Sequence, residues 1–321
     1  MAYDYAGNNT RPHWGLDAAT DEHLELFQGQ VDSAFEYNSI FREMQTAKSV
    51  EGQSNTARFD RMSAPTAKVR QSGDAIEAER LVDDKLLITV NGMVYTRKAI
   101  DYADDWTSPS RMAEITKQQG IALAKQYDQE HIAVLQKIGG TTAPADLNGF
   151  YDGHKEEAVI DADLEVYADN LVKAHAAGVA EMIERDLGEL SEFVTLVSPT
   201  IFNALMNAKK LLNVDFSQGN GDFAQRRIAF LNGVMLKENA RFVKTAQTTG
   251  FGTVISADEA AVGMVTFIPD LTVATVEAKP IFTKIWDDEG NMTNVSDSMG
   301  MYTVAHRRPD AGFVVQSVVA P

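Results

Sequence analysis

The chain has 321 residues and a formal net charge of −17. This acidity argues against a dedicated nucleic-acid binder, because such a protein needs a basic surface to displace the counterions of the phosphate backbone. Cysteine is absent, which excludes disulfides, thiolate metal sites and cysteine nucleophiles. The N-terminus lacks a basic start followed by an apolar run, and no stretch approaches the ~20 apolar residues of a membrane span. We therefore expect a soluble protein of a reducing compartment with no membrane partner.

The first part of the chain has little core pattern. Residues 1–20 are polar and without periodicity, so we expect a mobile arm there. Between residues 24 and 44 apolar side chains recur at helical spacing, which predicts a short helix that packs on another element or another chain. The shared face of this helix carries Leu24, Phe27, Val31 and Phe35, with Ile40 and Met44 further on.

The long polar segment of residues 52–83 is the most unusual stretch, because loops longer than ~12–15 residues are uncommon unless functional or disordered. Its large apolar residues are too sparse for a core: Phe59, Met62, Val69 and Ile76. Its basic residues stand out in an acidic chain: Arg58, Arg61, Lys68 and Arg70. One interpretation is a disordered loop. The other is a two-stranded arm, with a turn at Gly73 on its return limb, that contacts an acidic neighbour through opposite charge.

The polar segment opens into a predicted strand pair at 86–90 and 93–97, which leads into one long helix. Ser108 can cap this helix, and Pro109 suits its first position because the missing N–H has no intrahelical partner there. An apolar stripe runs to Ile138, and Gly139 with Gly140 is the expected stop. About thirty residues at ~1.5 Å each span about 45 Å. We expect this helix to be the spine of an elongated molecule.

The remaining sequence predicts two more helices and a β-rich end. One helix is expected from Asp163 to Leu187, capped by Asp161 or Asp163 and closed by Gly188. A buried strand at 193–197 is followed by a Ser198 cap, a helix at 201–212 and strand-like runs at 228–231 and 234–236. The C-terminal third predicts strands at 263–268, 271–277, 281–286, 301–305 and 313–319, with a hairpin turn at 287–291.

The sequence carries no recognisable motif for catalysis or ligand binding. Its six histidines include no pair at the spacing of a helical zinc site. His131 and His175 fall on apolar helical faces and are interpreted as core residues. The carboxylates of Asp161, Asp163 and Glu165 alternate as in a calcium loop, but the glycine and distal glutamate of that loop are missing. We expect no enzyme, cofactor or metal; an enzyme with an unrecognised site stays an alternative.

The order of these elements resembles the major capsid protein of tailed bacteriophages, the Hong-Kong-97-type fold, and most closely its T-seven-like podophage branch. Residues 24–35 resemble the N-terminal helix, residues 52–59 with Ala64, Ala67 and Gly73 the extended loop, and residues 83–105 the strands that lead to the spine helix. Residues 194–205 and 228–235 resemble the axial domain, and 300–315 the closing strand of the peripheral domain. The resemblance covers most of 24–321, and 141–162 and 213–222 match poorly.

The resemblance implies an α+β chain with an N-terminal arm, an extended loop, a long spine helix, a peripheral β-rich domain and an axial α/β domain. The expected division places the N-terminal arm with its short helix at 1–47 and the extended loop at 48–84. The peripheral domain is expected at 85–140 and 264–321, with the spine helix at 109–138. The axial domain is expected at 141–263.

The resemblance also implies a function. Such a chain would self-assemble as hexamers and pentamers into an icosahedral virion shell that encloses phage double-stranded DNA, and it would assemble in the host bacterial cytoplasm. Expected partners are a scaffolding protein, a portal protein and packaged DNA in weak, non-specific contact; the presence of a cement protein is left open. An encapsulin-like compartment shell is the alternative.

The resemblance finally suggests which residues meet between subunits. Some relatives cross-link a loop lysine to a neighbour, and Lys68 lies in the loop. Its asparagine and acidic partners are not identifiable, so we expect non-covalent closure. The candidate inter-subunit contacts are Arg58, Phe59, Arg61, Lys68, Arg70, Leu24, Phe27 and Phe35.

Overall fold

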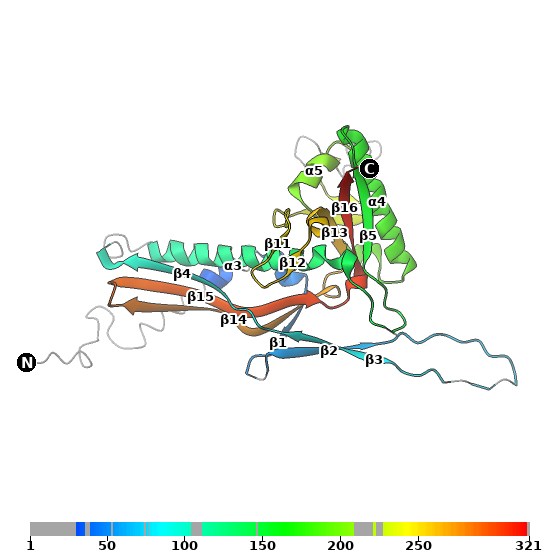
Figure 1. Cartoon of the computed structure of the whole chain (residues 1–321), viewed down its shortest axis with the longest axis horizontal. Helices are drawn as coiled ribbons and strands as arrows, with labels where there is room; N and C mark the ends of the chain where they lie inside the picture. Colours follow the sequence, from blue (N-terminus) through cyan, green and yellow to red (C-terminus); the bar gives the residue numbers. More distant parts are fainter. Residues whose placement is uncertain are drawn as a thin grey trace, which may run out of the picture.

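The computed structural model describes residues 30–35, 39–52, 54–73, 75–76, 78–103, 111–145, 147–208, 221–222 and 227–319. The long helix α3 (Arg111–Gln136) lies along a four-stranded sheet, and a second sheet with helices α4 (Leu164–Glu184) and α5 (Pro199–Leu205) stands at one end of it (Figure 1). A two-stranded arm of β2 (Thr56–Met62) and β3 (Asp83–Thr89) projects from the body. Among the described residues no helix is long and apolar enough to cross a membrane.

The four-stranded sheet has the order β1-β14-β15-β4. Its members are β1 (Thr46–Ser49), β14 (Val273–Asp288), β15 (Thr293–His306) and β4 (Val94–Asp101). β14 and β15 form one long hairpin, which confirms the predicted turn after Asp287. The strands expected at 271–277 and 281–286 are one strand with register shifts around Lys279. β1 was not predicted, because its mostly exposed residues show no apolar alternation.

The six-stranded sheet has the order β5-β16-β13-β6-β10-β9. Its members are β5 (His154–Ile160), β16 (Gly312–Val319), β13 (Val262–Phe267), β6 (Val194–Val197), β10 (Val234–Glu238) and β9 (Phe230–Leu231). β5 lies in the region that the sequence left unassigned. β13 and β16, from the end of the chain, pair with β6 and β5, so this sheet draws strands from both expected domains.

Short elements complete the described chain. Two small ribbons pair β7 (Gly221–Asp222) with β8 (Arg227–Ile228), and β11 (Gln247–Thr248) with β12 (Val254–Ile255). The remaining turns of helix are α8 (Ala257–Ala260), η1 (Phe41–Glu43), η2 (Ile138–Gly140), η3 (Leu190–Glu192) and η4 (Pro309–Ala311).

The predicted apolar stripe of α3 is confirmed. Its buried residues include Ala124, Tyr127, Ile132 and Leu135, which face both sheets in one core cluster with Phe41 and Phe267. The helix ends at Gln136, and Gly139 and Gly140 lie in the following η2 turn. Ser108 and Pro109, the predicted cap and first residue, lie outside the described residues.

The predicted N-caps of α4 and α5 are confirmed, while both predicted ends were too late. Asp163 accepts from the backbone N–H of Glu165 at 2.9 Å, and Ser198 accepts from the N–H of Ile201 at 3.4 Å. α4 ends at Glu184 before Asp186, whose φ of 54° leaves the helical region, so Gly188 does not close it. α5 ends at Leu205 because the chain tightens there into i→i−3 bonding, from the N–H of Asn207 to the carbonyl of Ala204.

Two further predictions were wrong. Residues 30–35 are helical, but the helix does not continue to Met44, because residues 41–43 form the separate η1 turn, held by Asp128 of α3. The strands expected to pair with each other, now β3 and β4, belong to different sheets: β3 pairs with β2 and β4 with β15. The N–H of Val90 donates to the carbonyl of Asn55 at 2.7 Å, which continues the β2–β3 ladder up to the point where the chain turns away.

Candidate inter-subunit surface

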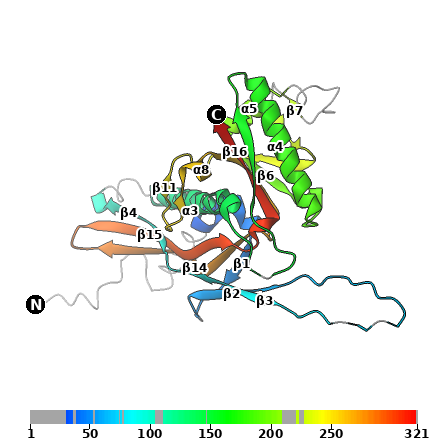
Figure 2. The ribbon, with the colours of Figure 1, turned by 45° about the vertical axis from the view of Figure 1, so that its right-hand side comes forward.

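The arm is an antiparallel ribbon that leaves the body near β1, as Figure 2 shows. Its strands pair from Thr56 opposite Thr89 to Met62 opposite Asp83. Beyond the ribbon, Ser63 donates its N–H to the carbonyl of Val82 at 3.0 Å. The arm exposes large apolar side chains, at fractions of 63 % for Met62, 100 % for Val69, 80 % for Ile76, 63 % for Leu81 and 62 % for Leu87. Exposed apolar groups concentrated on one projection mark an interaction surface.

The root of the arm is packed into the body. Ala57 and Ile88 of the ribbon join a buried cluster with Val50, Val90, Ala274 and Val276. Lys48 donates from Nζ to the carbonyl of Arg58 at 2.8 Å and lies 5.1 Å from the ring centre of Phe59. These contacts hold the first half of β2 against β14 and leave Phe59 only partly exposed.

A loop at residues 147–150 contacts the middle of the arm. Ala64 donates its N–H to the carbonyl of Asn148 at 2.8 Å, and Asn148 Nδ2 donates back to the Ala64 carbonyl at 3.1 Å. Gly149 has a φ of +84°, and a Cβ there would lie 2.7 Å from the Cβ of Ala64. Only glycine therefore fits both the backbone and the close approach. This paired contact fixes the direction of the arm beyond its root.

Arg61 belongs to the same attachment. Its Nη2 donates to the carbonyl of Arg307 at 2.6 Å, and its side chain is only 14 % exposed beside Asp84. Burial is the main cause that lowers the pKa of Arg61. Next to it, Arg308 donates to the carbonyl of Gly149 and pairs with the carboxylate of Asp310, which is 1 % exposed. Burial raises the pKa of Asp310, and Arg308 opposes that rise.

The structure separates the candidate contact residues into three groups. Arg58, Lys68 and Arg70 are exposed on the arm. Three candidates are engaged within the chain. Arg61 donates to the carbonyl of Arg307, and the partly buried Phe59 packs under Lys48. Phe35 is buried at 3 % and packs edge-on against Tyr127 with ring centres 5.3 Å apart. Leu24 and Phe27 lie outside the described residues.

Sequence reasoning missed two features of the arm. The return limb carries Glu79, Asp83 and Asp84, so the arm combines a basic outgoing limb with an acidic return limb. The exposed side chains of Leu81 and Leu87 also went unnoticed. The excess of acidic residues over residues 74–84 is the sequence signal that could have identified the acidic return limb.

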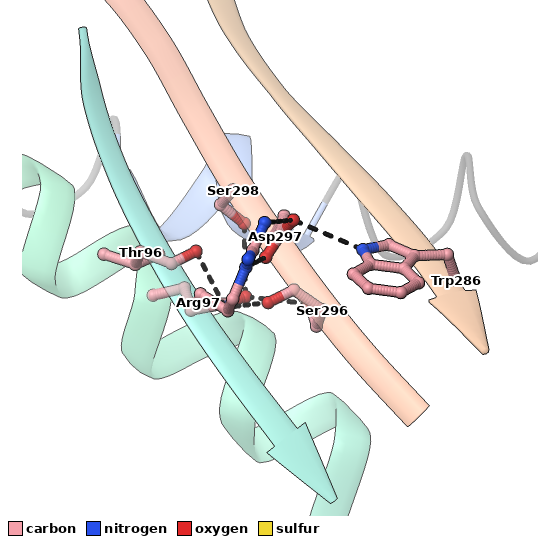
Figure 3. Close-up of polar contacts among 7 residues, drawn as sticks. Thr96, Arg97, Trp286, Ser296, Asp297 and Ser298 are labelled. Carbon is pink, nitrogen blue, oxygen red and sulfur yellow. Dashed lines mark hydrogen bonds and ion pairs between the residues drawn. The ribbon is translucent and has the colours of Figure 1, made fainter. Parts of the chain in front are cut away.

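A polar row crosses the four-stranded sheet (Figure 3). Arg97 of β4 donates from Nε and Nη2 to the two carboxylate oxygens of Asp297 on β15, at 2.7 and 2.8 Å. Trp286 of β14 donates from its indole nitrogen to Asp297 at 3.3 Å. The hydrogen bond from Arg97 is the main cause that lowers the pKa of Asp297. The row ties three strands together on the sheet face turned away from α3.

The opposite face of the same strands holds the spine helix. Gln119 of α3 donates to the carbonyl of Ser296 at 2.9 Å and accepts from the hydroxyls of Ser296 and Ser298 at 3.0 and 3.1 Å. All three residues are buried. The helix and the long hairpin are therefore joined by specific hydrogen bonds as well as by apolar packing.

The two helical histidines are core residues, as predicted. His131 contacts the carbonyl of Tyr127 at 2.8 Å and the hydroxyl of Thr275 at 2.8 Å, and burial lowers its pKa to about 4. His175 contacts the hydroxyl of Thr195 at 3.0 Å, and burial lowers its pKa to about 3. In the described part of the chain no group of three or more histidine or acidic residues is arranged to hold a metal ion.

The long helix on a hairpin sheet, the upright second sheet and the projecting arm define the Hong-Kong-97-type capsid fold. Residues 89–315 match the family model described as phage capsid protein. The chain belongs to this family, and it is a phage major capsid protein that forms the shell of the virion. Members of this family are structural shell proteins rather than enzymes. A comparison with curated proteins gives no match.

Solved structures give the same fold. The mature capsid of bacteriophage PhiM1 is 44 % identical, covers 100 % of both chains and has a TM-score of 0.81. The capsid of cyanophage P-SCSP1u is 16 % identical over 88 % of this chain and 89 % of its own, with a TM-score of 0.75. A virus-like particle from Pyrococcus furiosus is 11 % identical over 92 % of this chain and 100 % of its own, with a TM-score of 0.55. The last two show a common fold alone.

Proposed function

We propose that this capsid protein assembles as hexamers and pentamers into an icosahedral shell that encloses phage double-stranded DNA. The observation that carries the proposal is the projecting arm, whose apolar side chains at Val69 and Ile76 are almost fully exposed and find no cover within the described chain. Burying such side chains fully is worth about 1.5–3 kcal/mol each. A second copy that receives the arm would supply this burial.

The arm favours head-to-tail assembly. A projection on one side of the subunit must fit a different surface of the next subunit, and such heterologous contacts close into rings when the rotation permits. Many weak contacts then act together, so each can stay reversible while the closed shell is stable. We propose Arg58, Phe59, Lys68 and Arg70 as contact residues and non-covalent closure, with Lys68 not cross-linked.

The remaining partners follow from the family resemblance. We propose a separate scaffolding protein, a portal protein and assembly in the host bacterial cytoplasm, within the T-seven-like podophage branch; a cement protein is a further candidate. The net charge of −17 supports only weak contact with packaged DNA. The division into N-terminal arm, extended loop, peripheral domain and axial domain is part of the same proposal. The compartment-shell alternative is not favoured, because the 44 % identity is to a phage capsid.

Excising the arm tip tests this function. Thr66 donates its N–H to the carboxylate of Glu79 at 3.0 Å, so residues 67–78 can be removed and the ends joined by a short glycine linker. We expect a chain with unchanged circular dichroism and unfolding midpoint that no longer forms shells by sedimentation velocity and negative-stain imaging.

A matched variant separates the effect of arm length from the effect of the apolar side chains. Replacing residues 67–78 by a glycine–serine segment of equal length keeps the span but removes Val69 and Ile76. We expect this variant also to fail in assembly, because the apolar contacts are lost. Normal shells from the excised chain would refute the role of the arm.

A further inference from the structure

A small hairpin connects the spine helix to the root of the arm. The ribbon of β11 and β12 is closed by Thr249, whose N–H donates to the carbonyl of Thr253 at 2.9 Å, and by Gly252 with a φ of +83°. The hairpin lies beside α3 (Figures 1 and 2). Nothing in the assembly role described above uses this hairpin.

Glu130 of α3 holds the hairpin. Its side chain is 1 % exposed, and its carboxylate accepts from the hydroxyl of Thr249 at 2.8 Å and from Gln126 at 2.8 Å. The backbone N–H groups of Gly250 and Phe251 also donate to it. Burial raises the pKa of Glu130, and these hydrogen bonds oppose the rise. A buried carboxylate is costly unless such donors satisfy it, so the hairpin and Glu130 depend on each other.

The tip of the hairpin presses on the junction between arm and body. A Cβ on Gly92 would lie 2.6 Å from Cδ1 and 2.9 Å from Cε1 of Phe251, so the ring rests against the Gly92 backbone. The same ring packs on Tyr302 of β15 with centres 4.9 Å apart. Gly92 lies between the end of β3 in the arm and the start of β4 in the sheet. The ring therefore packs directly against the backbone of this junction.

We propose that residues 247–255 form a latch that sets the direction of the arm at its root, while the Ala64–Asn148 contact acts further along the arm. Glu130 attaches the latch to the spine helix, and Phe251 is its contact on Gly92. Loss of the hydrogen bonds to Glu130 would release the hairpin from the spine helix and with it the ring from Gly92. This inference rests on the proposed function only in that the arm is taken to serve assembly. Its mechanics can be measured on chains that have not assembled.

A double-mutant cycle tests the contact. Gly92→Ala should displace the ring and Phe251→Ala should remove it, so each should speed hydrogen exchange at the Val90 amide, which donates to Asn55 at the arm root. We expect an increase of about tenfold for each single variant. Gly92→Ala should add little in the Phe251→Ala background, because the added methyl group no longer meets a ring. Additive effects, or no effect, would overturn the contact.

A second measurement follows the arm itself. The chain has no cysteine, so spin labels on Val69→Cys and Leu164→Cys, both at exposed positions, report one arm-to-body distance. Labelled chain diluted into excess unlabelled chain keeps the measurement within one subunit. We expect Phe251→Ala and Glu130→Ala to broaden the distance distribution, and Glu114→Ala, an exposed site on the same helix, to leave it unchanged.

The outcomes separate the latch from the proposed function. Distributions that stay narrow in Phe251→Ala and Glu130→Ala refute the latch, whatever happens to assembly. Broad distributions with normal shells support the latch and show that assembly does not depend on it. Broad distributions with defective shells support both.

Discussion

Removing the carboxylate of Asp128 should detach the segment before β1 from the spine helix. Asp128 is 2 % exposed and accepts from the hydroxyl of Ser39 at 2.9 Å, from the N–H of Ile40 at 3.2 Å and from the N–H of Phe41 at 3.4 Å. The Phe41 ring below it is fully buried and stacks on His131 with centres 4.8 Å apart.

The magnitude follows from those donors. Leaving a buried donor unsatisfied costs about 1–3 kcal/mol. Asp128→Ala would leave the buried N–H of Phe41 and the partly buried N–H of Ile40 without this acceptor. Burial raises the pKa of Asp128, so the native carboxylate carries a desolvation cost that the alanine variant recovers. We expect a net loss of about 3 kcal/mol for Asp128→Ala and about 1 kcal/mol for Asp128→Asn, whose amide oxygen still accepts.

Urea unfolding of the unassembled chain measures this difference, with Glu114→Ala as the exposed control on the same helix. Hydrogen exchange at the Phe41 amide should accelerate in Asp128→Ala and much less in Asp128→Asn. An Asp128→Ala chain within about 0.5 kcal/mol of the native chain would refute the reasoning, because surface substitutions already reach that size. An asparagine variant as unstable as the alanine variant would show that charge, rather than hydrogen bonding, dominates.

Two further predictions concern stability. Gly178→Ala should lower the free energy of unfolding by about 1–2 kcal/mol despite the better helix propensity of alanine, because its Cβ would lie 2.3 Å from the buried Phe313 ring. Adding Phe313→Leu to this variant should relieve much of the loss. A thermal midpoint unchanged by Gly178→Ala would contradict the prediction. For His175, burial lowers the pKa from 6.5 to about 3, so the unfolded chain takes up the proton first. The stability from neutral His175 is complete above pH 6.5 and is lost as pH falls toward about 3, by about 2 kcal/mol at pH 5. His175→Gln should flatten this dependence in urea titrations, and an equally steep dependence would assign it to other groups.

Local sequence patterns were enough to predict the helices whose apolar stripe and capping residues lie within their own segment. The spine helix shows a continuous apolar stripe, and α4 and α5 begin at side chains that cap them, Asp163 and Ser198. The strand-like runs on either side of Gly233 contain β9 and β10, whose pairing as a hairpin was not predicted. In each case the information lies within one turn of helix or one strand, so a single sequence is sufficient.

The arm was predicted in part for the same reason. Its length, polarity and lack of core residues indicated a projection, and the structure confirms a two-stranded arm. Its attachment could not be predicted. The partners of Ala64 and Arg61 are Asn148 and Arg307, at sequence separations that no local pattern reports.

The spine helix, the strand-rich C-terminal end and the existence of the arm could be predicted because periodicity and caps are properties of short segments. The class of the protein followed from the order of these elements along the chain. The structure was needed to show which strands pair, that β13 and β16 enter the upright sheet, and that Phe251 rests on Gly92. Strand pairing and close packing depend on contacts between segments that are distant in the sequence. The apolar surface buried between two such segments stabilises these contacts, and neither segment supplies this free energy alone.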